Sequence, residues 1–366
     1  MTAAPSTHPA QAAGQPPVQR ARELADRLLR PGAEHTDTHG VERAVVDELG
    51  RAGLLGLAGP RGYGGSQAPA PVLREVTEIV AGADGSTWFV TTQHALPLQA
   101  LARSENVALK ERHLHGMCTG ALLAGVAVAH LRRPGPAAVT ATRTPGGWQF
   151  DGAVGWTTSW GLADLLLLGG LSTAGEVVLA LVPARAAPGL AASPPMRLAA
   201  MQATATVSLT LGGLQVGDAD VAEVSRAALW LEADRYKTAN ATPAVFGLLQ
   251  EVVRRLAGTA PQRSHVAGQL AARLGEEGEE LRRDAYALVD HVAPAEQLED
   301  RLALRAASLE LLMRAATALV VASGGAAMGI DAAPQRLARE ALFHLVQAQT
   351  LPVREATLGR LLDRTA

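Results

Sequence analysis

The spacing of apolar residues changes twice along this chain, and that change limits the folds it can adopt. Up to about residue 122 apolar side chains recur at helical intervals, as Leu24, Leu28 and Leu29 do. From 123 to 224 short runs rich in Val, Thr and Leu alternate with Gly and Pro, which is typical of strands and turns. Long helical segments then return. The order predicts an α+β protein that is mainly α, with a β-region between two helical blocks.

The same patterns predict individual elements. The dipeptide Pro31-Gly32 should stop the first helix. A hairpin is expected over 140–160, and shorter strands over 164–170, 176–183 and 204–211. Long helical segments with short links predict a C-terminal four-helix bundle, and they cover 245–256, 266–288, 298–323 and 334–362.

These elements divide the chain into four parts. Residues 1–17 are rich in Ala, Pro and Gln and lack a basic start followed by an apolar stretch, so they predict a disordered tail and no signal peptide. An N-terminal helical domain over 18–122, a β-domain over 123–224 and a helical bundle over 225–366 should follow.

Charge and cysteine usage narrow the classes of function. The net charge is −2, and residues 225–366 hold 17 Lys and Arg against 17 Asp and Glu, which argues against nucleic acid as a partner. No apolar run reaches the roughly 18 residues that span a bilayer. One cysteine, Cys118, rules out an intrachain disulfide and suits a cytoplasmic protein. No His or Cys spacing indicates a metal site.

Four motifs occur in an order that resembles the acyl-CoA dehydrogenase family. They are ELGRAGLLGL at 48–57 with GYGG at 62–65, DGAVGWTTS at 151–159, the pair Gly324-Gly325, and REALFHLVQAQT at 339–350. The resemblance implies that family's fold: an N-terminal helical domain, a middle β-domain and a C-terminal four-helix bundle. It also implies a homo-oligomer, a homodimer or homotetramer, with a flavin between the β-domain and the bundle.

The resemblance also suggests which residues bind the cofactor, FAD or FMN. Trp156 would stack on the flavin and Thr158 would bond near its reactive nitrogen, since an indole offers a flat face and a hydroxyl both donates and accepts. Thr350 would lie near the cofactor. The remaining candidates are Ser159, His130, Arg132, Gly324 and Gly325, of which Arg132 could meet phosphate.

The chain departs from the family where its catalytic glutamate would stand. Counting from Arg339, that position holds Ala348, which cannot take a proton. Some relatives place the base on the first bundle helix, where Asp234 and Glu232 are available, although acidic residues are ordinary at a helix start. The loop at 258–264 is shortened, and its Arg263 is out of register with the family's arginine.

The sequence therefore leaves three functions open. The first is a flavin-dependent oxidoreductase acting on an acyl thioester, possibly acyl-CoA, or on a related small substrate. The second is a flavin-dependent monooxygenase of the same fold, because such relatives lack the glutamate and use His, Ser and Thr near the flavin. Thr158, Ser159 and the histidines His94, His130 and His344 keep that reading open, although each histidine alone is more often a structural residue. The third is a catalytically inactive flavin-binding relative.

Overall fold

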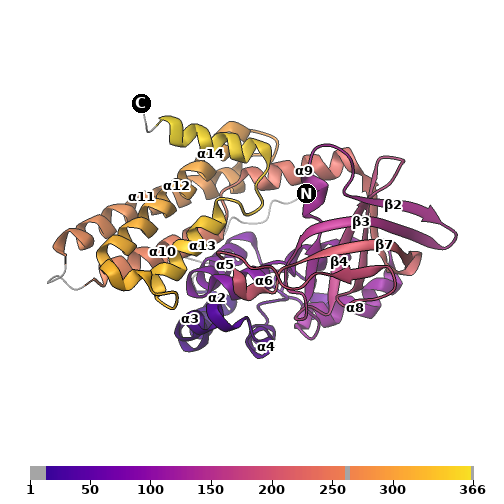
Figure 1. Cartoon of the computed structure of the whole chain (residues 1–366), viewed down its shortest axis with the longest axis horizontal. Helices are drawn as coiled ribbons and strands as arrows, with labels where there is room; N and C mark the ends of the chain where they lie inside the picture. The colour runs from indigo at the N-terminus through magenta and orange to yellow at the C-terminus, as the bar shows by residue number, and fades with distance from the viewer. Residues whose placement is uncertain (1–13, 260–263, 364–366) are drawn as a thin grey trace.

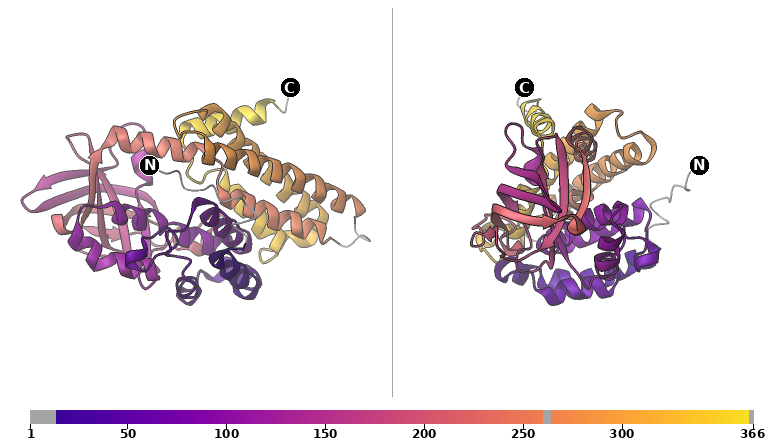
Figure 2. Two further views of the ribbon diagram at one scale, coloured as in Figure 1. Left: turned by 180° about the vertical axis from the view of Figure 1, so that it is seen from behind. Right: turned by 90° about the vertical axis from the view of Figure 1, so that its right-hand side faces the viewer.

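The computed structural model describes residues 14–259 and 264–363. A curled sheet occupies one end of the long axis and a bundle of long helices the other, with the N-terminal helices packed beneath both (Figures 1 and 2). This is the α+β, mainly helical architecture that the sequence predicts. Residues 1–13 of the expected tail lie outside the described residues, and the first helix already begins at Pro16.

The N-terminal part is built from helices whose apolar faces meet in one core. They are α2 (Pro16–Leu24), η1 (Ala25–Leu29), α3 (Arg30–His39), α4 (Arg43–Arg51), α5 (Ala70–Ala83), α6 (Gly85–Thr92), α7 (Ala95–Arg103) and α8 (Val107–Thr119). The predicted stop at Pro31-Gly32 is wrong. A π-helical turn, η1, leads directly into α3 and places Pro31 at the junction, where the helical hydrogen-bond pattern is already irregular and a residue without an N–H is tolerated. The chain therefore stays helical to His39.

The middle part is an eight-stranded sheet of mixed direction. Its strands are β1 (Ala124–Ala127), β2 (Val139–Thr144), β3 (Gly147–Thr157), β4 (Leu165–Leu171), β5 (Glu176–Pro183), β6 (Leu190–Ala192), β7 (Val207–Gly217) and β8 (Val221–Arg226). The order is β6-β7-β3-β2-β4-β5-β8, with β1 pairing parallel to β4. The predicted hairpin is β2 and β3. The strands β1, β6 and β8 were not expected from the sequence.

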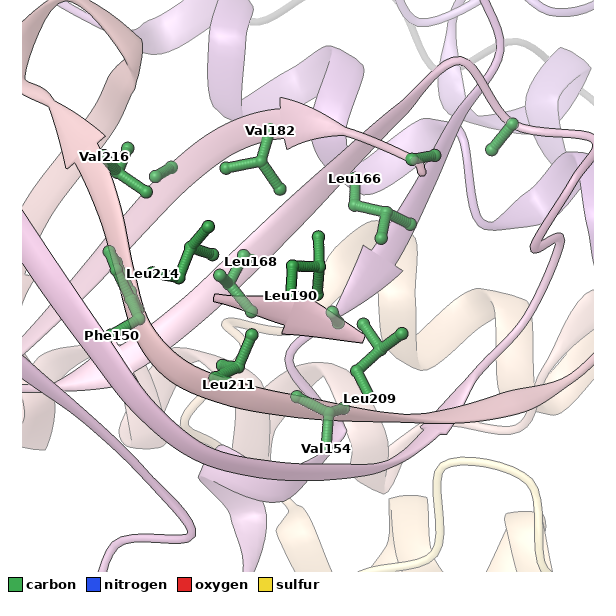
Figure 3. Packing of buried hydrophobic residues seen from close by; sticks show 14 of the residues in the cluster. Phe150, Val154, Leu166, Leu168, Val182, Leu190, Leu209, Leu211, Leu214 and Val216 are labelled. Carbon is green, nitrogen blue, oxygen red and sulfur yellow. The ribbon is translucent and has the colours of Figure 1, made fainter. Parts of the chain in front are cut away.

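Apolar side chains from both halves of the sheet fill its concave side (Figure 3). Phe150 and Val154 of β3 face Leu166 and Leu168 of β4, while β7 contributes Leu209 from its own inward positions. Alternate residues along β7 point inward, as a half-buried strand requires. This packing fixes β3 rigidly, and β3 carries the motif at 151–159.

The C-terminal part contains the bundle. Its helices are α9 (Ala227–Ala239), α10 (Pro243–Ala257), α11 (His265–His291), α12 (Leu298–Ser323), α13 (Ala333–His344) and α14 (Leu351–Asp363), with a short turn η6 (Gly324–Met328) after α12. The single helix expected over 334–362 is broken at 345–350. Pro352 explains the break, because proline fits the first turn of α14 but not a helix interior.

Helices α5 and α10 cross at two glycines and join the N-terminal part to the bundle. A Cβ placed on Gly82 would lie 2.5 Å from the carbonyl oxygen of Gly247, and one on Gly247 would lie 2.0 Å from the carbonyl oxygen of Glu78. No side chain fits at either position. The two helical parts therefore touch backbone to backbone.

One segment in the described part of the chain, Leu298–Met328, is long and apolar enough to cross a membrane by length and composition. Central helices of soluble bundles pass the same test, so this is weak evidence. Only 33% of its most apolar window is buried within this chain. Among the described residues, nine of the seventeen exposed large hydrophobic side chains lie between Val321 and Leu362, at the end of this segment and beyond it in sequence. The end of the bundle thus presents an apolar surface.

Candidate active site

Three parts of the chain meet beside the end of β3. Ser159 N–H donates to the carbonyl oxygen of Thr204 at 2.9 Å, and Ser86 of α6 contacts the sulfur of Met201 at 4.0 Å. From the other side, the ring of His344 packs against Trp88 of α6 with centroids 5.2 Å apart. We call this region the seam. It comprises residues 84–92, 130–132, 156–159, 201–206, 234–238, 305 and 344–350.

The end of β3 presents an indole and several hydroxyls. Trp156 is 51% exposed, although its neighbours Thr157, Thr158 and Ser159 are buried. Thr158 Oγ1 shares a hydrogen bond with Thr206 Oγ1 at 3.1 Å, whereas the hydroxyls of Thr157 and Ser159 have no partner among the described residues. Ser159 also has a positive φ of 70°, which is costly for a residue with a Cβ. This is a rigid strand end with unused donors and an uncovered ring.

The two candidate residues Arg132 and Asp234 bind each other. Arg132 lies in the turn η3 (Ala129–Arg132), and its Nε and Nη2 each donate to an oxygen of Asp234 on α9 at 2.8 Å. Such a two-point pair is a strong, directional contact. Asp234 would have to leave it before taking a proton from a substrate. Glu232 is exposed and accepts a hydrogen bond from Tyr236 at 2.6 Å.

The three candidate histidines differ in how much of each ring is free. Both nitrogens of His94 are used: Nε2 bonds the carbonyl oxygen of Met117 and Nδ1 accepts from the N–H of Ala124, each at 3.0 Å. His130 Nε2 donates to the carbonyl oxygen of Gly169 at 2.9 Å, which leaves Nδ1 without a partner among the described residues. Burial lowers the pKa of both rings to about 4, so both are neutral at pH 7.

His344 is also buried and neutral. Its environment lowers its pKa to about 3, first by burial and then through the nearby guanidinium of Arg305. Its Nδ1 has no hydrogen-bond partner in the described part of the chain. The ring can therefore offer a bare nitrogen to a hydrogen-bond donor, but it is a weak base.

Arg305 of α12 is a site residue that the sequence analysis missed. Its side chain is 3% exposed and donates to the carbonyl oxygens of Thr238, at the end of α9, and of Gln347 at 2.8 Å. No Asp or Glu pairs with it in residues 14–259 and 264–363. Burial, then Arg132, lowers its pKa to about 10. Arg305 is the one charged residue between Arg301 and Glu310 in the sequence of α12, and that was the available signal.

The corner around Arg132 is electropositive. Burial and then Arg132 lower the pKa of Lys237, as they do for Arg305, so Arg132 lies close enough to repel each of these two cations. Asp234 balances one of these three charges. A phosphate, or a ring that carries negative charge, would be stabilised here.

The turn at 345–350 brings Ala348 to the seam. Ala348 is half-buried with a φ of 49°, and the preceding carbonyl, that of Gln347, is the one held by Arg305. Thr350 immediately precedes α14, and its Oγ1 accepts from Val353 N–H at 3.5 Å. Gly324 and Gly325 are exposed, with no atom within 4 Å of a Cβ built on either. No hydrogen bond between described residues ties these two glycines to the seam.

A layer of buried charge lies one helical turn from the aromatic contact between Trp88 and His344. Arg336 donates to Glu340 at 2.6 Å, and Arg339 donates to Asp37 of α3 at 2.5 Å. Asp84 caps α6 by accepting from Thr87 N–H at 3.0 Å. Glu340 packs on Gly85, where a Cβ would lie 2.6 Å from its carboxyl carbon. Helices α6 and α13 thus contact each other through Glu340 and Gly85 and, one helical turn further along, through the rings of Trp88 and His344.

The unpartnered buried groups give a test of whether a flavin fits. Ten buried side-chain atoms lack a hydrogen-bond partner in the described residues. Six of them belong to the seam: Trp88 Nε1, His130 Nδ1, Thr157 Oγ1, Ser159 Oγ, Arg305 Nε and His344 Nδ1. Native proteins rarely leave such groups unpaired without a ligand or water. A ring edge with carbonyl and N–H groups, lying beside Trp156, would supply partners for the hydroxyls of Thr157 and Ser159 at the strand end.

Comparison with known proteins shows which fold this chain shares. Residues 17–121 match the acyl-CoA dehydrogenase N-terminal domain family. The fold is similar to butyryl-CoA dehydrogenase from Megasphaera elsdenii, with a TM-score of 0.79, 16% identity and coverage of 99% of this chain and 100% of that one. It is similar to a glutaryl-coenzyme A dehydrogenase in complex with glutaryl-CoA, with a TM-score of 0.82, 17% identity and coverage of 100% and 97%. The FAD complex of PigA gives a TM-score of 0.79 at 15% identity, covering 100% of both chains.

A sequence relative is the dibenzothiophene monooxygenase of Rhodococcus erythropolis, which is 35% identical over 109 residues. That match spans 29% of this chain and only 25% of the relative's length. The resemblance to the acyl-CoA dehydrogenase family is thereby confirmed, by sequence over residues 17–121 and by fold over the whole chain.

Proposed function

We propose that this chain, built on the acyl-CoA dehydrogenase fold, is a flavin-dependent monooxygenase. One observation carries the proposal. The turn that would present the family's base has Ala348 in that register, and in the described part of the seam the carboxylate of Asp234 is held by Arg132. Unpartnered hydroxyls lie at the strand end instead, and the rings of His130 and His344 in the seam are neutral. The partial sequence match to a dibenzothiophene monooxygenase supports the same choice.

A bound reduced flavin would supply the two electrons by which one atom of O₂ becomes water while the other enters the substrate. The protein's own groups would bind and orient. Trp156 would cover one face of the ring by stacking. The hydroxyls of Thr157 and Ser159 would bond its polar edge, and the cations around Arg132 would stabilise negative charge on it.

The neutral histidines would act as hydrogen-bond acceptors. His344, with its pKa near 3, would not hold a proton at pH 7 but can accept a hydrogen bond at Nδ1 from a group beside it. Its packing against Trp88 keeps the ring in place. The buried surroundings would exclude bulk water, which protects reactive species from side reactions.

A second candidate is the dehydrogenation of an acyl thioester with Asp234 as the base. Its side chain lies at the seam and is 11% exposed, so a substrate could reach it if the pair with Arg132 opened. Loss of a positioned base costs about 10²- to 10⁴-fold in rate, so Asp234→Asn should then abolish turnover.

One experiment separates the two. Purified protein is mixed with FMN or FAD reduced by dithionite, then with ¹⁸O₂ and dibenzothiophene as the probe substrate, and the product is analysed by mass spectrometry. We expect one ¹⁸O atom per product molecule and a large loss in Trp156→Ala. In parallel, protein loaded with oxidised FAD is mixed anaerobically with butyryl-CoA. Bleaching of the flavin in that arm, with no oxygen incorporation in the first, would overturn the proposal in favour of dehydrogenation.

A further inference from the structure

A cavity of about 220 Å³ lies within the N-terminal helices, away from the flavin-binding face of the seam. It is enclosed by the end of α4, the loop at 54–58, and helices α5, α6 and α7. Its inner wall is formed by Leu49, Leu57, Val76, Val80 and Leu98, all of them buried. No side chain that lines the cavity is acidic, basic or a histidine. An ionised ligand would therefore be poorly solvated there.

The polar lining residues Thr77, Thr91, Thr92 and Gln99 are less buried than the inner wall, so they mark the mouth. The hydroxyls of Thr77 and Thr91 donate to carbonyl oxygens of their own helices, at 2.7 and 2.8 Å. Thr92 and Gln99 also line the cavity and are half-buried. Neither of those two side chains makes a hydrogen bond with any described residue. A ligand could thus meet an apolar interior and a polar rim, the usual composition of small-molecule sites.

Trp88 connects the cavity to the seam. Its ring lines the cavity and also packs against His344. The side chain is 5% exposed, and its Nε1–H has no acceptor among the described residues. A buried indole N–H normally finds a partner. An acceptor atom on a ligand in the cavity would supply one.

We propose that this cavity binds a small, uncharged, apolar compound of one or two rings that carries a hydrogen-bond acceptor toward Trp88. The volume suits that size, since an apolar cavity of about 150 Å³ already admits benzene. The site goes beyond the proposed function and does not depend on it, because none of its walls belongs to the strand end or to the turn at 345–350. The occupant would contact Trp88, whose ring packs against His344.

The test uses two isosteric probes on the full chain at pH 7.5, without flavin. Quinoline and naphthalene have the same shape, but only quinoline carries an acceptor nitrogen. Calorimetry should show saturable one-to-one binding of both, with quinoline at least about threefold tighter. Trp88→Phe should abolish that preference, because phenylalanine has no N–H. The anion 2-naphthoate should not bind.

Matched variants assign the binding to this cavity. Ala95→Phe fills the cavity from α7 and should weaken both probes at least about tenfold, whereas Ala70→Phe, at an exposed position of α5, should leave binding unchanged. Ala58→Phe fills the cavity from the loop and serves if Ala95→Phe unfolds, as judged by circular dichroism. Equal binding by the filled variants, displacement of the probes by FMN, or no saturable binding at all would each overturn the proposal.

Discussion

The charged layer between α6 and α13 should make the stability of the fold depend on pH near neutrality. Asp37, Asp84 and Glu340 face Arg336 and Arg339 there, and Glu34 also pairs with Arg336, so the acids outnumber these two bases. Burial is the main cause that raises the pKa of Glu340 from 4.5 to about 7, and Asp84 and Asp37 raise it further, while Arg336 opposes them. The Glu340 carboxyl in this layer is therefore mostly protonated below pH 7 and mostly ionised above it.

The direction in which stability changes with pH follows from proton linkage. The folded state binds the proton of Glu340 more tightly than the unfolded chain does, so the stabilisation is complete below about pH 4.5 and is lost as the pH rises through 7. Each tenfold difference in proton affinity corresponds to about 1.4 kcal/mol. Between pH 5.5 and pH 8 the loss from Glu340 should thus be about 2 kcal/mol.

The variant Glu340→Gln isolates this contribution. Other buried groups titrate in the same interval, and the histidines act in the opposite direction because burial lowers their pKa. The free energy of unfolding of both proteins is measured with urea at pH 5.5 and pH 8. Between these two pH values the wild type should lose about 2 kcal/mol more of it than Glu340→Gln does, and this double difference is the predicted quantity. The exposed Glu355→Gln is the control and should show no double difference. A value below about 0.5 kcal/mol for Glu340→Gln would refute the reasoning.

Further predictions concern the seam and the bundle surface. Trp156→Ala should weaken flavin binding about tenfold, measured by fluorescence quenching, while Trp156→Phe should retain most of it, because a ring still stacks; equal affinity in all three proteins would contradict the stacking role. Arg305→Met should raise the pKa of His344 from about 3 without reaching 6.5, since burial remains after the guanidinium is gone, and imidazole C–H resonances followed by NMR would report it. Ala348→Glu should create or raise dehydrogenation of butyryl-CoA, assayed anaerobically; the register from Arg339 is wrong if flavin binds normally but no such activity arises. The apolar surface between Val321 and Leu362 should bury itself against a second copy, so sedimentation at micromolar concentration should give a dimer or tetramer and not a monomer.

The sequence predicts well what depends on local periodicity. The order of helical and strand blocks and the hairpin of β2 and β3 follow from patterns within each segment. By contrast, β1 and β6 have four and three residues and exist because β4 and β7 offer them hydrogen-bonding edges. So short a run carries little periodic signal of its own.

The candidate site likewise has one part that the sequence predicts and another that depends on how distant segments pack. Trp156 and the hydroxyls after it stand out as a motif, and the structure places them together at a strand end. The pair of Arg132 and Asp234 joins residues 102 positions apart, and Arg305 reaches carbonyls on α9 and in the turn at 345–350. Contacts of this kind depend on how the three parts pack. A single sequence reports the presence of these charges but not their partners.

The glycine crossing of α5 and α10 has a consequence for how this chain is made. The N-terminal helices complete their core only when Gly82 meets Gly247, which emerges from the ribosome 165 residues later. At about 5 to 20 residues per second, the apolar faces of α5 remain without that partner for roughly 8 to 33 seconds. Nascent chains should therefore engage a chaperone over this interval. A fragment ending before α10 should aggregate, even though it contains every residue of the domain that the family comparison matches.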